Sequence, residues 1–289
     1  MAESPAEPPF LRIGPDAPLS PVLLSVPHAG RSYSPALLGA SRLPRETLET
    51  LEDRLVDRLI WRAVAGGAGA LVALRPRAEI DLNRDEREID AAMIAPPPPS
   101  RSVMASPRTR GGLGLVPSRI TGAGAIWLDR LPGKELARRI LEVHRPYHAA
   151  LTEMLERVRA HFGIAILLDC HSMPPRALAG GTEAGVVLGD RHGTSIAPEL
   201  VLAAAEAVRA AGFEVARNEP YAGGYITQRH GRPGENIHAL QLEIDRATYL
   251  DPALRAPGPG FDKVARMIAA VSSALAGRAL EPPQAIAAE

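Results

Sequence analysis

Three short hydrophobic runs, each ending beside a side chain that can bind a metal ion or a proton, constrain this chain most. The runs PVLLSVPHAG, GIAILLDCHS and HALQLEIDR carry His28, His171 and Glu243. Apolar stretches such as 22–26 and 164–168 are typical of buried strands in a parallel sheet. Because open α/β sheets place their chemistry beyond the carboxyl ends of such strands, we expect these three side chains to meet in one crevice. Two imidazoles and a carboxylate suffice for a zinc ion that holds a water, with a general base beside it.

The composition fits one large α/β domain with a full hydrophobic core in its 289 residues. Lys plus Arg and Asp plus Glu number 33 each, so the formal net charge is zero, which argues against binding to nucleic acid or an anionic membrane surface. The sequence shows neither a signal peptide nor the roughly 20 apolar residues of a membrane span, so we expect a cytoplasmic protein. Cys170 is the only cysteine, which excludes an internal disulfide.

Helix and strand patterns alternate along most of the chain. Leucines at helical spacing predict a helix over 45–65, and a strand around 70–74 follows it. Further patterns predict one long helix or a pair of helices over 133–160, helices over 197–211 and 261–275, and strands over 185–188 and 213–216. This alternation predicts a single-domain, doubly wound α/β fold with a mixed, mainly parallel sheet and helices on both faces.

Stretches rich in Pro, Gly or Ala interrupt or flank this alternation. We expect a folded domain over 10–277, with flexible tails at 1–9 and 278–289. The stretch 93–124 contains PPPP, SPRTRGG and PSRITGAG and predicts a long loop, which the sequence leaves open as a lid, an interface or a disordered segment. The stretch 218–238 is also predicted to be a loop.

Strand alternation sorts the side chains around the expected site. In LLDCHS it places Asp169 and His171 on one face and Cys170 on the other, so the thiol is predicted to pack in the core. In LQLEIDR it places Gln241 and Glu243 on one face. Polar side chains inside a core strand are costly unless they face a polar cleft, so both strands are predicted to border the site.

An acidic row on the predicted helix 45–65 supplies a candidate metal ligand. Glu49, Asp53 and Asp57 stand at i, i+4 spacing, and each like-charged pair disfavours a helix by roughly 0.2–0.5 kcal/mol. Asp53 has no cation among its helical neighbours. It therefore most needs a cation from elsewhere in the fold, either a metal ion or a distant arginine.

Two groups of basic residues could bind an anionic substrate. Arg77, Asn83 and Arg84 follow the second strand in RPRAEIDLNRDERE, where paired guanidinium groups suit bidentate capture of a carboxylate. The alternative is that they neutralise the acidic residues of the same segment. Arg229 and His230 in TQRHG could also hold an anion, or could lie in an exposed turn, and the GDRHG motif allows the same two interpretations.

Taken together, these motifs resemble those of the N-formylglutamate amidohydrolase family, which is related in fold to zinc carboxypeptidases. The motifs are SVPHAG, RxxxDxNR, LLDCHS, LGDRHG, NEPYAGGYIT and ALQLEIDRATYLD, and they extend from about residue 22 to residue 251. The resemblance implies a phosphorylase/hydrolase-like, zinc-exopeptidase-like fold. It also implies zinc-dependent hydrolysis of N-formyl-L-glutamate to formate and L-glutamate, with one Zn²⁺ per chain.

The resemblance further implies roles for individual residues. His28 and His171 correspond to the two zinc-binding histidines, and Glu243 corresponds to the general base. The related enzymes supply the carboxylate ligand from an HxxE motif, but this sequence reads HAGR, so Asp53 is our candidate for the third ligand. The predicted substrate-binding residues are Asn83, Arg84, Arg77, Arg229 and His230.

Two other functions remain open at this point. One is a zinc-dependent deacylase or carboxypeptidase-like enzyme that acts on another anionic N-acyl amino acid, because the arginines imply only that the substrate is anionic. The other is a non-catalytic protein that binds an acidic metabolite, which the missing HxxE acid favours and Glu243 opposes. The expected partner is a small anionic N-acyl amino acid, and the sequence also leaves open a homo-oligomer.

Overall fold

The computed structural model describes residues 8–176 and 184–281 of the chain. Most of the two predicted tails, at 1–7 and 282–289, lies outside these residues. Within the described ranges, no helix is long and apolar enough to cross a membrane.

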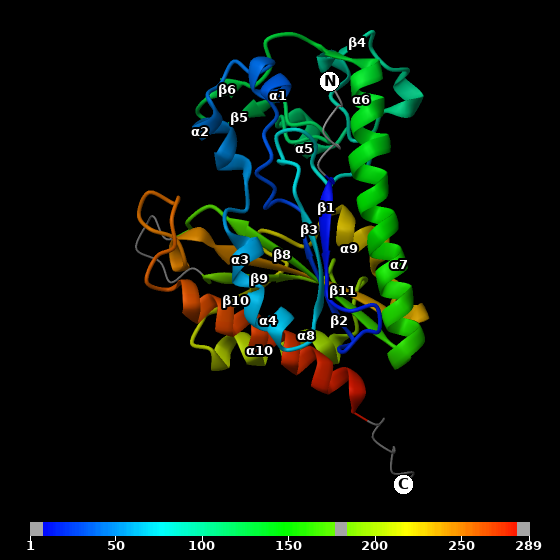
Figure 1. Cartoon of the computed structure of the whole chain (residues 1–289), viewed down its shortest axis with the longest axis vertical. Helices are drawn as coiled ribbons and strands as arrows, with labels where there is room; N and C mark the ends of the chain where they lie inside the picture. Colours follow the sequence, from blue (N-terminus) through cyan, green and yellow to red (C-terminus); the bar gives the residue numbers. More distant parts are fainter. Residues whose placement is uncertain (1–7, 177–183, 282–289) are drawn as a thin grey trace, which may run out of the picture.

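A seven-stranded mixed sheet forms the centre of the molecule (Figure 1). In spatial order its strands are β1 (Phe10–Ile13), β3 (Gly69–Ala73), β2 (Val22–Val26), β8 (Ala165–Met173), β11 (Ile237–Asp245), β9 (Val186–Gly189) and β10 (Val215–Arg217). The four strands β3, β2, β8 and β11 run parallel to one another. Strand β1 is antiparallel to β3, and β9 is antiparallel to β11 but parallel to β10. The predicted mixed, mainly parallel sheet is therefore confirmed, with β1 as an additional edge strand.

Helices cover both faces of this sheet, as predicted. Helix α7 (Arg145–Phe162) packs on one face and runs along the right side of Figure 1. The opposite face carries α3 (Val56–Leu59), α4 (Trp61–Ala65), α8 (Pro198–Ala210) and α10 (Phe261–Leu280). Helix α10 ends five residues beyond the predicted end at 275, so residues 278–280 belong to the helix and not to a tail.

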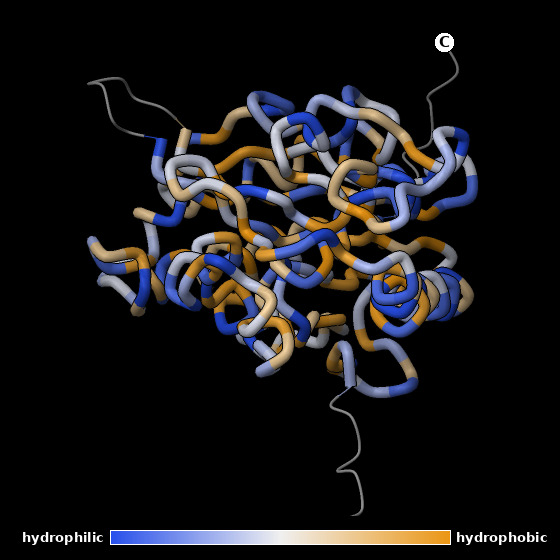
Figure 2. Tube along the Cα trace, turned by 90° about the horizontal axis from the view of Figure 1, so that it is seen from above, coloured by the Kyte–Doolittle hydropathy of each residue, from blue (hydrophilic) through white to orange (hydrophobic). Residues whose placement is uncertain are grey.

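Side chains of the central strands alternate between two hydrophobic cores, one on each face. On β8, Leu167 packs in the core with α7, whereas Leu168 packs in the core with α8 and α10. Cys170 is fully buried in this second core, as strand alternation predicted, and burial raises the pKa of its thiol. Asp169 and His171 fall on the opposite side of the strand, next to α7. Seen from above, hydrophobic segments run through the interior between more hydrophilic outer turns (Figure 2).

The remaining elements are short, and most of them gather at one end of the sheet, in the upper part of Figure 1. This group comprises α1 (Pro35–Gly39), α2 (Arg45–Leu48), α5 (Pro107–Arg110), α6 (Gly133–Arg139), β4 (Ile94–Ala95), β5 (Arg119–Ile120), β6 (Gly124–Ala125) and β7 (Leu131–Pro132). Helix α6 continues through one π-helical turn, η4 (Ile140–His144), into α7, which confirms the long helix predicted over 133–160. The short 3₁₀ turns are η1 (Glu49–Leu51), η2 (Ala91–Met93), η3 (Ser100–Ser102), η5 (Pro233–Glu235) and η6 (Arg246–Thr248).

The segment 45–65 is not the single helix that its leucines predict. After α2 and η1 the backbone is extended at Glu52 (ψ 148°) and left-handed at Leu55 (φ 63°), and only then does α3 begin. Asp53 lies in this break, where its main-chain N–H donates to the carbonyl of His28 at 2.9 Å. The predicted row of like-charged helical residues therefore does not form, because this hydrogen bond draws Asp53 out of a helix and toward the end of β2.

The long loop over 93–124 is packed against the domain. Leu115 and Val116 are buried. The main chain of Leu115 accepts a hydrogen bond from the N–H of Asp81 at 2.7 Å and donates one to Glu88 at 2.6 Å. Of the three interpretations left open by its composition, disorder is excluded. The other predicted loop, 218–238, contains the helix α9 (Tyr225–His230).

A matched pair of glycine substitutions tests how closely the chain after β2 approaches the chain after β3. A Cβ on Gly30, which follows β2, would lie 2.0 Å from the main-chain oxygen of Arg75, so Gly30→Ala is expected to destabilise the fold by about 1–3 kcal/mol. A Cβ on Gly277 in α10 meets nothing within 4 Å, so Gly277→Ala is expected to stabilise the fold by roughly 0.5–1 kcal/mol. Urea unfolding of both variants measures the difference. Equal stability of Gly30→Ala and the unaltered protein would contradict the close approach of β2 to the segment after β3.

Candidate metal centre and active site

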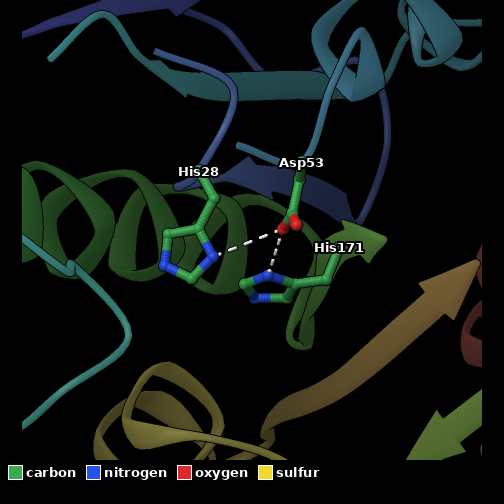
Figure 3. Close-up of side chains that lie close together, drawn as sticks. All are labelled: His28, Asp53 and His171. Carbon is green, nitrogen blue, oxygen red and sulfur yellow. Dashed lines mark hydrogen bonds and ion pairs between the residues drawn. The ribbon is translucent and has the colours of Figure 1, made fainter. Parts of the chain in front are cut away.

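His28, Asp53 and His171 lie together near the carboxyl ends of β2 and β8 (Figure 3). Their ligand atoms all lie within 4.8 Å of one another, and all three residues are buried. His28 follows β2 by two residues, His171 lies near the end of β8, and Asp53 comes from the break between η1 and α3. The fold therefore brings together the three residues that were predicted as metal ligands.

The Nδ1 atoms of both histidines face the same oxygen of Asp53. His171 Nδ1 lies 2.8 Å from Asp53 Oδ2, and His28 Nδ1 lies 3.3 Å from it. The Nδ1 atom of His28 is buried and has no hydrogen-bond partner in the part of the chain that the structure describes. A buried nitrogen without a partner is costly unless a ligand provides one. Two imidazole nitrogens and one carboxylate also form the three-ligand set that zinc takes with its fourth position open, so these residues fit a bound zinc ion.

Asp81, for which no role was predicted, orients His28. Its buried carboxylate accepts a hydrogen bond from His28 Nε2 at 2.7 Å. It also accepts one from the main-chain N–H of Asn83 and one from Arg77 Nε, each at 2.9 Å. Burial favours the neutral acid, but the charges of Arg77 and Arg84 keep the pKa of Asp81 well below its usual value. Because the carboxylate holds the proton of His28 on Nε2, the lone pair of Nδ1 is left to face Asp53.

Asp169, which shares a strand face with His171, orients that histidine in the same way. Its Oδ2 lies 2.9 Å from His171 Nε2, and its Oδ1 accepts a hydrogen bond from the hydroxyl of Ser25 at 2.8 Å. Burial disfavours a charge on His171, but Asp169 and Asp53 together raise its pKa well above the usual value. The surrounding carboxylates thus favour positive charge at this position, whether a proton or a metal ion carries it.

A cavity of about 360 Å³ opens beside these three residues, within the usual size range of small-molecule sites. Glu243 lines it and stands opposite His171 in the register of β11 and β8. Gln241 Nε2 donates to Glu243 Oε1 at 2.7 Å. Burial raises the pKa of Glu243 to about 7, although the charge favoured on His171 opposes this shift. A buried carboxyl group with a pKa near neutrality is suited to accept and return a proton.

Three of the five predicted substrate-binding residues line this cavity. These are Arg77, Asn83 and Arg84. The side chain of Asn83 is held on both sides, since its Nδ2 donates to Gln241 Oε1 at 3.3 Å and its Oδ1 accepts the N–H of Ile226 at 2.8 Å. Arg84 is buried, and its guanidinium group donates to two main-chain carbonyl groups. Arg77 and Arg84 also neutralise Asp81 of the same segment, so the alternative interpretation holds in part, although these charges pair in a buried setting and not in solvent.

Arg229 and His230, which were also predicted to bind the substrate, do not line this cavity. Both belong to α9, and the helix turns them toward α7 instead. Arg229 donates to the hydroxyl of Tyr225 at 2.8 Å and lines a separate pocket. His230 is buried, with its Nε2 3.0 Å from Nδ1 of His148. Their positions do not support the prediction, because the loop-like composition of 218–238 concealed a helix.

Two further arginines line the cavity and had no predicted role. Arg246 follows β11 directly, donates to the hydroxyl of Ser172 at 3.0 Å and lies 3.3 Å from Asp53. Its place in LEIDR, at the end of the strand that carries Glu243, was an available signal. Arg108 comes from α5 within the long loop. No local pattern could identify it, because composition does not show where such a loop meets the sheet.

Comparisons with known proteins identify the family of this chain. Residues 20–250, which include every candidate ligand and the candidate base, match the model of the N-formylglutamate amidohydrolase family. The N-formylglutamate deformylases of Pseudomonas aeruginosa and Pseudomonas putida are each 32% identical over 237 residues, which are 80% of this chain and 82% of theirs. The crystal structure of N-formylglutamate amidohydrolase from Ralstonia eutropha JMP134 aligns with a TM-score of 0.86 and 34% identity, over 93% of this chain and 98% of that one. The chain therefore belongs to the N-formylglutamate amidohydrolase family, a family of enzymes that hydrolyse an amide bond.

Proposed function

We propose that this chain is a zinc-dependent enzyme that hydrolyses N-formyl-L-glutamate to formate and L-glutamate. The observation that carries the proposal is the placement of His28, Asp53 and His171 beside Glu243 in one cavity lined with arginines. Two relatives at 32% identity bear the name N-formylglutamate deformylase, which supports this substrate over other anionic N-acyl amino acids.

In this proposal three side chains hold one zinc ion per chain. His28 and His171 bind through their Nδ1 atoms, which Asp81 and Asp169 orient from the opposite edge of each ring. Asp53 provides the carboxylate ligand. When bound, zinc acidifies water toward a pKa of about 7 and polarises the formyl carbonyl.

Glu243 then moves the protons of the reaction. It removes a proton from the water that attacks the formyl carbon, and it delivers a proton to the amide nitrogen as the C–N bond breaks. The water oxygen becomes a carboxylate oxygen of formate, and the nitrogen leaves as the amine of L-glutamate. Gln241 holds Oε1 of the base in place throughout.

The substrate carries two carboxylates, and the cavity provides cationic groups to neutralise them. We assign one carboxylate to Arg84 and Asn83, with Arg77 beside them. Asn83 and Arg84 are adjacent in the chain, and the main-chain N–H of Asn83 donates to Asp81. Because Asp81 also accepts the hydrogen bond from His28, it connects this anion site to His28. The metal and the substrate are thus placed relative to each other through a single buried carboxylate.

The first test is metal content together with formate release. The purified protein is expected to contain one zinc ion per chain and to release formate from N-formyl-L-glutamate. Chelation should abolish the activity and added zinc should restore it, as measured by elemental analysis and a formate assay. Full activity in metal-free protein would contradict the proposal. Metal without formate release would redirect the search to other N-acyl amino acids, whereas absence of metal would favour a non-catalytic binding protein.

A Glu243→Gln variant tests the proton-transfer role. It is expected to retain its zinc and to lose formate release by about 10²–10⁴-fold, because the amide cannot accept the proton of the attacking water. Glu206→Gln, at an exposed position of α8, is the matched control and should be unaffected. The assignment of the base fails if Glu243→Gln, with zinc bound, turns over at the normal rate.

An Asp81→Asn variant tests the orientation of His28. Its zinc affinity is expected to fall about 10–100-fold, because the amide is a weaker acceptor for the Nε2 proton and no longer fixes the ring. Competition with a metal-binding dye measures this affinity directly and does not depend on activity. Asp262→Asn, which changes a carboxylate at the surface of α10, is the control. Unchanged affinity in Asp81→Asn would show that His28 is oriented by other contacts.

A further inference from the structure

The four arginines that line the cavity differ in how their guanidinium groups are held. Arg77 donates to a buried carboxylate, Arg84 donates to two main-chain carbonyl groups, and Arg246 donates to a serine hydroxyl. Each of these three has hydrogen bonds that fix it to the protein. The guanidinium group of Arg108, in contrast, has no hydrogen-bond or ion-pair partner within the described ranges of the chain. Its full set of N–H donors is therefore available to a ligand in the cavity.

The helix that carries Arg108 is firmly attached to the domain. In α5, the Ser106 hydroxyl accepts the N–H of Thr109 at 3.1 Å, and the Thr109 hydroxyl accepts the N–H of Ser106 at 2.9 Å. Ser106 also donates to the carboxylate of Glu88 at 2.8 Å. Beyond the helix, the main-chain N–H of Leu115 donates to Glu88 at 2.6 Å. These contacts place Arg108 at a defined position on the cavity wall.

Positive charge is concentrated around this residue. Burial, opposed by Asp81, lowers the pKa of Arg84 to about 10, and the charges of Arg77 and Arg108 contribute to this shift. Arg108 also contributes, after burial, to a lowered pKa of Arg191 in the GDRHG motif. Guanidinium groups that repel one another in this way are stabilised when a carboxylate binds among them.

We propose that Arg108 determines substrate specificity by binding the side-chain carboxylate of an N-formyl dicarboxylic amino acid. The inference rests on the proposed hydrolysis of N-formyl amino acids and assigns the second anionic group of the substrate. Arg84 and Asn83 bind the first carboxylate, and Arg108 binds the second through two parallel N–H···O bonds. A substrate with a neutral side chain leaves this guanidinium group unpaired and binds less well. The loop over 93–124 therefore acts as a specificity loop.

The test compares N-formyl-L-glutamate with N-formyl-L-glutamine, which has nearly the same shape but no side-chain charge. The intact zinc enzyme is expected to prefer the glutamate derivative. In Arg108→Gln, kcat/KM for N-formyl-L-glutamate should fall about 10–100-fold, mainly through KM, as expected for the loss of a charge-assisted hydrogen-bonded pair. The value for N-formyl-L-glutamine should change little, so the preference collapses. Arg108→Lys keeps the positive charge but lacks the planar guanidinium group, so its preference for N-formyl-L-glutamate should lie between that of the unaltered enzyme and that of Arg108→Gln.

Arg110→Gln is the matched control, because Arg110 is exposed on the same helix and does not line the cavity. Zinc content and melting temperature should be unchanged in all three variants. Equal losses on both substrates in Arg108→Gln, or an unchanged preference, would overturn the inference. If the unaltered protein hydrolyses neither compound, the proposed function fails instead. Calorimetric binding of L-glutamate and L-glutamine to the protein and to Arg108→Gln then decides whether Arg108 recognises the side-chain carboxylate.

Discussion

The site depends on the buried carboxylate of Asp81. This one group accepts hydrogen bonds from the ring of His28, from the main chain at Asn83 and from the side chain of Arg77. An isolated charge in such a place would be strongly disfavoured, and these donors together stabilise the carboxylate. As a result, a candidate metal ligand and the segment proposed to bind the substrate are held by the same two oxygen atoms, and neither can shift without disturbing the other.

The topology of the sheet explains why the remaining groups meet there. Strands β2, β8 and β11 are parallel neighbours, so their carboxyl ends open at one edge and deliver His28, His171 and Glu243 to the same place. The alternation of side chains lets one strand serve two purposes. On β8, residues facing α8 and α10 build a dry core, while residues on the α7 side become polar toward the end of the strand. The site is therefore an extension of one of the two cores.

Patterns within short stretches of the sequence predicted those features of the fold that depend on local backbone geometry. The strands, their two faces and the placement of His171 and Glu243 followed from hydrophobic periodicity. Asp53 was identified for an incorrect reason, because the predicted helical row does not form and a long-range hydrogen bond to His28 shapes the segment. Arg229 does not line the cavity, and no pattern pointed to Arg108, which does. The positions of both side chains depend on how a Pro- and Gly-rich segment packs against distant elements, and hydrophobic periodicity gives no information about such packing.

Arg31 stands where an HxxE motif would place its acid, three residues after His28. Its guanidinium group forms a two-pronged ion pair with Asp57, at 3.0 Å and 2.5 Å. That pair fastens the start of α3 to the chain leaving β2 and keeps the irregular backbone around Asp53 against the two histidines. The segment that carries Asp53, the candidate carboxylate ligand, is therefore linked by this ion pair to the chain that follows His28. The three candidate metal ligands come from three separate segments, so a search for ligands within one contiguous motif would overlook this site.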